Sequence, residues 1–173
     1  MLAGVSPRTL YRYYGSKGAL FAATIAEGAA DFLEQLAAYV QQWPLRRSIL
    51  AAFTNAAIEV SEESRALMHL AVTEDEVNRH WLSTSQRMLP SLAGILRSAA
   101  GSGTCGSPVA WEVRGAALLS AFTVGYQRWA TTSGSDLLAV MTEAVDTVLA
   151  ILQPVTESTD TDRSAATTSQ DEP

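Results

Sequence analysis

Six side chains near the start of the chain carry groups that can bind nucleic acid. They are Arg8, Thr9, Tyr11, Arg12, Tyr13 and Lys17. No acidic residue lies among them, because the first acid of the chain is Glu27. Guanidinium and ammonium groups beside hydroxyls are the donors that bind phosphate oxygens and base edges. The stretch therefore favours contact with double-stranded DNA.

Local signals place these side chains on a short helix. Gly4 suits the positive φ of a tight turn. Ser6 is a favourable N-cap, and Pro7 follows it at the first helical position, where its missing N–H costs nothing. Leu10 and Tyr14 are four residues apart, so one face can be buried while the basic and hydroxyl residues point outward. A turn followed by such a helix is the second half of a helix-turn-helix.

The same stretch resembles the DNA-reading end of tetracycline-repressor-type (TetR family) regulators. The matching residues are Ala3-Gly4-Val5-Ser6, Thr9-Leu10-Tyr11, Tyr13-Tyr14, Lys17 and Leu20. Tyr13 and Tyr14 stand where that family usually has histidine and phenylalanine. The resemblance covers about residues 2 to 21. It implies that the usual first helix and most of the second are missing at the N-terminus.

The resemblance assigns roles to individual residues. Tyr11 and Tyr13 would contact phosphates or base edges, and Thr9 and Lys17 would bind phosphates. The remaining two, Arg8 and Arg12, are the candidates for reading bases, because arginine to guanine is the commonest specific contact.

The implied function is that of a ligand-responsive transcriptional regulator that binds a pseudopalindromic operator as a homodimer. We expect it to act as a repressor. The alternative is an N-terminally truncated paralogue, which dimerises and binds a small ligand but does not bind DNA by itself.

Composition narrows the class of protein. The chain has 173 residues, of which 47% are hydrophobic and 17% charged, enough to bury a core. Its net charge of −6 argues against a general nucleic-acid coat protein. One cysteine, Cys105, allows no intrachain disulfide. Without a signal-peptide pattern or a run of ~18 apolar residues, we expect a cytoplasmic protein with no membrane partner.

Apolar residues recur at helical spacing throughout, and no segment alternates with strand period, so the fold class is predicted to be all-α. Six helices are expected. Their ranges are 17–42, 45–60, 65–72, about 74–96 with Thr73 as the N-cap, 109–130 and 136–152. Pro90 should kink or split the fourth of these near residue 89. Three regions follow: 1–42, a partial helix-turn-helix head with its connecting helix; 43–153, a helical-bundle body for ligand binding and dimerisation; and 154–173, a disordered acidic tail.

No enzyme or metal signal stands out. His69 and His80 are eleven residues apart on different predicted helices, without a partner at ligand spacing, so each is expected to be a polar core or pocket residue. The acids at 62–63 and 74–76 sit at helix starts, where the helix dipole explains them. We therefore expect no catalytic residues, no metal and no cofactor.

The predicted body is rich in aromatic and methionine side chains. Their first interpretation is as core, but helical bundles also enclose ligand cavities. The resemblance implies a cavity for an apolar or mixed small-molecule effector. Candidate lining residues are Phe53, Met68, Trp81, Met88, Trp111, Phe122 and Tyr126.

The last two helices pose a choice between core and interface. The final one is apolar on well over half of its circumference, which suits either the centre of a monomer or half of an oligomer interface. The helix before it carries small residues that allow close approach: Gly115, Ala116, Ala117, Ala121 and Gly125. These features favour a homodimer through 109–130 and 136–152, and the resemblance implies the same interface.

Overall fold

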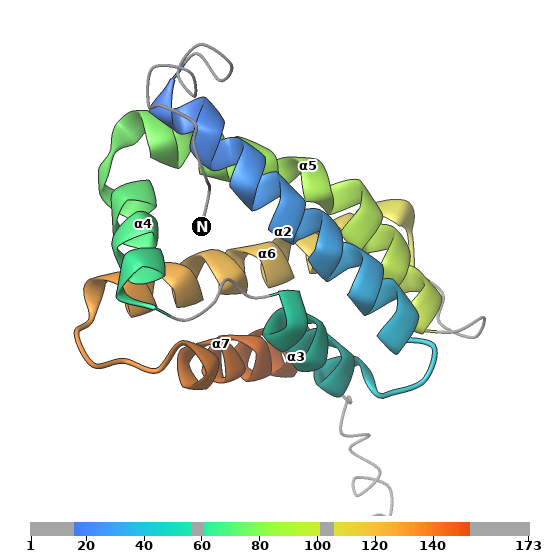
Figure 1. The fold of residues 1–173 in the computed structure, drawn as a ribbon. Helices are drawn as coiled ribbons and strands as arrows, with labels where there is room; N and C mark the ends of the chain where they lie inside the picture. The colour runs from blue at the N-terminus through green and yellow to red at the C-terminus, as the bar shows by residue number, and fades with distance from the viewer. Residues whose placement is uncertain (1–15, 57–60, 101–105, 153–173) are drawn as a thin grey trace, which may run out of the picture.

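The computed structural model describes residues 16–56, 61–100 and 106–152, which form six α-helices and no strand (Figure 1). The helices are α2 (Lys17–Tyr39), α3 (Leu45–Ala56), α4 (Glu62–Thr73), α5 (Asp75–Ala99), α6 (Pro108–Thr131) and α7 (Leu137–Leu152). The predicted all-α class is confirmed for these residues. No helix among them has the length and apolar character needed to cross a bilayer. Cys105 and the acidic tail lie outside the described residues.

Serine caps determine where three of the helices begin. Ser16, Ser61 and Ser107 each accept a hydrogen bond from the backbone N–H three residues later, at 3.2, 3.1 and 3.2 Å. At Ser61 the bond is reciprocated, because its own N–H donates to the Ser64 hydroxyl at 2.9 Å. Each cap satisfies a donor that the first helical turn leaves unpaired. The cap at Ser61 starts α4 three residues earlier than the predicted Arg65.

The predicted cap at Thr73 is wrong. Thr73 is the last residue of α4, and its hydroxyl donates to the carbonyl of His69 at 2.9 Å. Glu74 precedes α5 and makes no side-chain capping bond. The threonine hydroxyl is already satisfied by the preceding turn, so it does not cap the following helix.

Pro90 does not split the helix that contains it. α5 is continuous through this position. Proline removes the donor for the carbonyl of Gln86, but both residues lie on the exposed side of the helix, where water can replace the bond. On the other side, Trp81 and Leu92 are buried before and after the proline, so both halves of the helix pack into the core.

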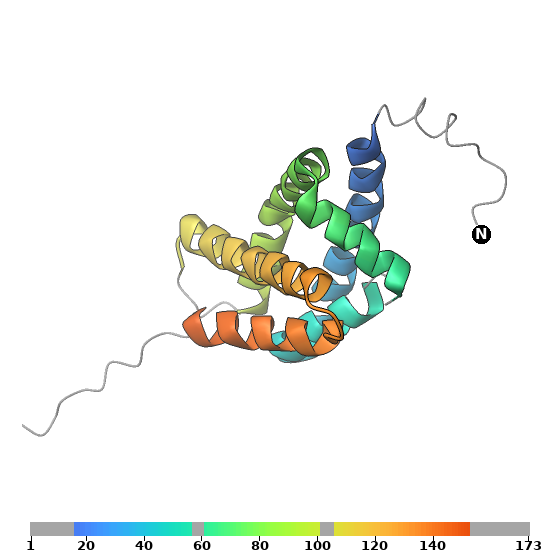
Figure 2. The same cartoon turned by 90° about the vertical axis from the view of Figure 1, so that its left-hand side faces the viewer.

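The helices pack into one core. α5 lies beside α2 and α6, α3 joins α2 to α7, and α4 crosses α5 and α6 (Figures 1 and 2). Each helix contributes at least one fully or almost fully buried side chain: Leu36, Ile49, Met68, Leu92, Leu118 and Met141. α6 and α7 run side by side in both views.

The glycines that favoured a dimer face point into the chain instead. A Cβ at Gly115 would lie 3.0 Å from the side chain of Leu89 on α5, and Gly125 lies against Met141 on α7. Small residues on α6 therefore allow close packing within one chain. The exposed large apolar side chains of these two helices are Val109, Val113, Val124, Leu138 and Ile151.

Two arginines connect distant segments. Arg65 of α4 donates hydrogen bonds to the carbonyls of Trp129, Thr132 and Ser135, and its guanidinium lies 4.7 Å from the centroid of the Trp129 ring. It thereby closes the C-terminal end of α6, whose last carbonyls have no helical donor.

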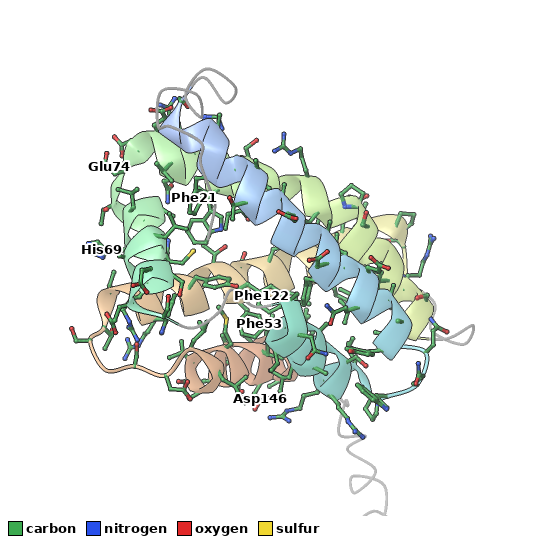
Figure 3. All side chains as sticks on the ribbon, in the orientation of Figure 1. Phe21, Phe53, His69, Glu74, Phe122 and Asp146 are labelled. Atoms are coloured by element: carbon green, nitrogen blue, oxygen red, sulfur yellow. The ribbon has the colours of Figure 1, made fainter. Side chains whose placement is uncertain are left out.

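On the surface, Arg46 of α3 donates two hydrogen bonds to the carboxylate of Asp146 on α7. Figure 3 shows Asp146 on α7 below α3. The hydrogen bonds from Arg46 hold the pKa of this carboxyl below its ordinary value. Both side chains are about half exposed, so water screens the pair.

Candidate functional site

A cavity of about 100 Å³ lies between α2, α3, α5 and α6. Its wall consists of Thr24, Ile25, Gly28, Ala29, Phe32, Phe53, Ala56, Trp81, Ser85, Met88, Leu119, Phe122, Thr123 and Tyr126. Thr24 is exposed to solvent, so the cavity reaches the surface beside α2.

Five aromatic rings from all four helices line the cavity and contact one another. Phe122 is central: its centroid lies 5.3 Å from that of Phe32, edge to face, and 6.1 Å from that of Phe53. Tyr126 lies 5.9 Å from Phe53 and 6.5 Å from Trp81. Figure 3 shows Phe53 and Phe122 together between α3 and α6. Such pairs stabilise the wall beyond the area that they bury.

Helical spacing brings the wall residues to the same side of each helix. On α6, Leu119, Phe122 and Tyr126 are three and four residues apart, and on α5 so are Trp81, Ser85 and Met88. Residues at these separations form one face of a helix. The wall of the cavity is therefore a set of neighbouring helix faces.

Hydroxyl groups are the polar part of the wall. The Ser85 hydroxyl donates to the carbonyl of Trp81 and that of Thr123 to the carbonyl of Leu119, each at 3.0 Å. Their hydrogens are engaged, and their oxygen lone pairs remain available. The Tyr126 hydroxyl makes no hydrogen bond with any described residue, and burial raises the pKa of Tyr126 to about 12.

Among the residues that the structure describes, the wall contains no Asp, Glu, Lys, Arg or His. Tyr126 is the one titratable residue at the described wall positions, and with a pKa of about 12 it stays neutral at ordinary pH. The cavity is therefore an uncharged, aromatic space with a few hydroxyl groups, suited to binding a small molecule.

Five of the seven candidate lining residues lie in this wall: Phe53, Trp81, Met88, Phe122 and Tyr126. Met68 and Trp111 do not. Met68 is buried on α4, a helix that contributes no wall residue. Trp111 is on nearly the same side of α6 as Phe122, but eleven residues earlier, about 16 Å along the axis. Its ring packs near Gly106 and Arg114 instead.

The wall contributed by α2 was not among the expected lining residues. It comprises Thr24, Ile25, Gly28, Ala29 and Phe32. Most of these are small or ordinary core residues, which nothing in their type distinguishes. Gly28 is the one residue of this set that the sequence marks as unusual, because glycine within a helix costs about 1 kcal/mol relative to alanine.

The side chains expected to bind DNA lie at or before the start of α2. Arg8, Thr9, Tyr11, Arg12 and Tyr13 are outside the described residues, and Lys17 is the first residue of α2. Two turns further along α2, about 10 Å away, the helix enters the cavity wall.

The histidines are not in the cavity. His69 is exposed on α4, so its expected place in a core or pocket is wrong. His80 is half-buried and packs against the first turn of α2, where a Cβ at Gly18 would lie 2.5 Å from its Cδ2. Within the described segments, no group of three or more His, Cys, Asp or Glu side chains could hold a metal ion.

Comparison with known protein families finds no match to this chain, and comparison with curated proteins finds none either. The chemistry and position of the cavity are therefore what point to a function.

Proposed function

We propose that the chain is a TetR-like, ligand-responsive transcriptional regulator that represses by binding a pseudopalindromic operator as a homodimer. One observation carries the proposal. α2 follows directly on the basic stretch at its N-terminus and forms one wall of the cavity two turns later. A ligand in the cavity would touch the helix that leads to the DNA-binding residues.

In this proposal the head reads DNA through the roles that the resemblance implies. Arg8 and Arg12 contact bases, Tyr11 and Tyr13 contact phosphates or base edges, and the Thr9 hydroxyl contacts phosphate. The ammonium group of Lys17 binds phosphate. Two heads in a homodimer would occupy half-sites about one DNA turn apart, ~34 Å.

Ligand binding would act by shifting a population between DNA-competent and DNA-incompetent arrangements of the heads. Packing at two levels of α2 supports such coupling. Phe32 contacts Phe122 within the cavity, and Gly18 packs against His80 near the start of the helix. His80 is adjacent in sequence to Trp81, a wall residue, so α5 touches both the cavity and the first turn of α2.

The proposed homodimer uses α6 and α7. Val109, Val113 and Val124 are more than half exposed on α6, and Ile151 is 73% exposed on α7. Burying such side chains against a second copy removes apolar area from water, which is the main driving force for association. The proposed setting is the cytoplasm, where the operator DNA is found.

A gel-shift titration with the DNA upstream of the coding sequence, beside random DNA of equal length, tests the proposal. Arg12→Ala should weaken binding to the specific fragment by about 1–3 kcal/mol, with little effect on random DNA. Lys17→Ala should weaken both about equally and reduce the slope of log affinity against log salt by about 1.

Equal losses on specific and random DNA for both variants would refute the assigned roles. A wild-type chain that sediments as a dimer and binds small molecules, yet shifts no DNA, would support the truncated paralogue instead. A monomer that binds neither DNA nor ligand would overturn both the proposed regulator and the truncated paralogue.

A further inference from the structure

We infer that the cavity selects an uncharged, ring-sized ligand that carries one hydroxyl or carbonyl group, with that group bound at the Tyr126 hydroxyl. The inference rests on the proposed ligand-binding function and names the chemical class that the site would accept. It follows from the charge, the hydrogen-bonding capacity and the volume of the cavity.

The absence of charge in the wall disfavours ions. At the wall positions within 16–56, 61–100 and 106–152, an anion would meet no Arg, Lys or His and a cation no carboxylate, since none of these residues carries a formal charge at neutral pH. Moving an ion from water into such a space is costly without a partner of opposite charge. A neutral ligand avoids this cost.

Aromatic faces can attract a cation even without a carboxylate, so the arrangement of the rings matters. Here the rings are engaged with one another. Phe122 meets Phe32 at 87° and stacks on Phe53 at 21°, and Trp81 meets Tyr126 at 82°. Each of the five rings therefore has at least one ring neighbour, which reduces the aromatic surface left for a quaternary ammonium group. The wall suits an apolar ring better than a cation.

The hydroxyl groups define what polar group a ligand needs. Tyr126 has a hydrogen to donate and no described partner to receive it. Thr123 is three residues away on the same side of α6 and can only accept, because its own hydrogen goes to Leu119. A ligand carbonyl would accept from Tyr126, and a ligand hydroxyl could also donate to Thr123 or Ser85.

Volume limits the apolar part. The cavity measures about 100 Å³, and an engineered apolar cavity of about 150 Å³ in another protein holds one benzene molecule. The apolar part of the ligand is therefore limited to about one ring, which carries its single hydroxyl or carbonyl group toward Tyr126.

Four probes of similar size test the inference by calorimetric titration of the full chain: phenol, toluene, benzoate and benzyltrimethylammonium. We expect phenol to bind roughly three- to tenfold more tightly than toluene, the contribution of one net hydrogen bond. Both ions should bind more weakly than toluene.

Three variants locate the binding. Tyr126→Phe should lower the affinity for phenol to that for toluene and leave toluene unchanged. The matched control is Tyr39→Phe. Tyr39 lies outside the cavity, and its hydroxyl accepts a hydrogen bond from Asn55. Removing this hydroxyl should change neither the affinity for phenol nor the affinity for toluene. Gly28→Leu, which directs a side chain into the cavity, should weaken both neutral probes.

Tighter binding of benzoate or benzyltrimethylammonium than of phenol would overturn the inference while leaving the proposed ligand-binding function intact. Unchanged phenol affinity in both Tyr126→Phe and Gly28→Leu would overturn it as well, since binding would lie elsewhere. If no probe of any charge binds the wild-type chain, the inference and the ligand-binding part of the proposed function fail together. A positive gel shift would then support only the DNA-binding part of the proposed function.

Discussion

Gly125 of α6 lies directly against the Met141 side chain of α7. A Cβ added at Gly125 would be 2.5 Å from Met141 Sδ and 3.1 Å from its Cε. Met141 is fully buried in the core, so its side chain has little room to move away. Glycine at this position lets α6 and α7 approach more closely than any other residue would allow.

This contact predicts that Gly125→Ala destabilises the protein. Alanine favours a helix over glycine by about 1 kcal/mol, but overpacking a filled core costs about 1–3 kcal/mol. We expect a net loss of about 1 kcal/mol in the free energy of unfolding, measured by urea denaturation. Gly94→Ala is the matched control, since a Cβ there meets no heavy atom within 4 Å, and it should stabilise α5. Equal stabilisation by both changes would contradict the close α6–α7 contact.

Gly28→Ala should stabilise the protein, although Gly28 lines the cavity. The nearest atom to a Cβ at this position is the carbonyl oxygen of Ala56, at 3.9 Å, so nothing need move. The gain in helix propensity should raise the free energy of unfolding by about 0.5–1 kcal/mol. Urea denaturation without ligand measures it. A destabilised variant would mean that α2 packs more tightly against α3 than the cavity implies.

Arg65→Ala should lower the free energy of unfolding by about 2 kcal/mol. It removes a charged donor from three carbonyls at and just after the end of α6. The Ser135 hydroxyl still donates to the carbonyls of Trp129 and Thr132, whereas the carbonyl of Ser135 loses the donor that Arg65 provides. Arg65→Lys should recover only part of the loss, because an ammonium group lacks the planar fork and the stacking on Trp129.

Chemical denaturation of both Arg65 variants checks this order. Arg97→Ala, at an exposed arginine near the end of α5, serves as control and should change stability by less than about 0.5 kcal/mol. A loss at Arg65 no larger than that of the control would show that the hydrogen bonds are not formed in solution.

Alkaline pH should weaken the folded state through Tyr126. Burial raises the pKa of its hydroxyl from 10.0 to about 12, because the charged phenolate is poorly solvated in the cavity. The resulting contribution to stability is complete below the unfolded pKa, 10.0, and is lost as the pH rises toward the folded pKa. Within this window the wild type should lose up to about 1.4 kcal/mol per pH unit more than Tyr126→Phe.

Urea denaturation of the two proteins at several pH values from about 9 to 11 tests this. The difference in unfolding free energy should be constant below pH 10 and change above it. Parallel curves across the whole range would show that Tyr126 titrates normally.

Local chemistry was enough to predict part of the site. Phe122 and Tyr126 were expected beside a cavity because aromatic side chains of a helical bundle can line a ligand cavity as well as fill the core. The same reasoning selected Trp111, which is on nearly the same side of α6 as Phe122 but about three turns away from it, outside the cavity wall. Residue type and spacing therefore give the side of a helix on which a residue lies, and not its level along the axis.

Residues within a few positions of one another were enough to predict the all-α class and the approximate spans of the helices. Which helical turns meet depends on the packing of the whole chain. The tertiary structure placed α2 in the cavity wall, turned Gly125 toward Met141 and kept α5 continuous through Pro90. These outcomes depend on contacts between helices far apart in the chain, whose relative height and crossing are set by packing of the whole core and have no local signal.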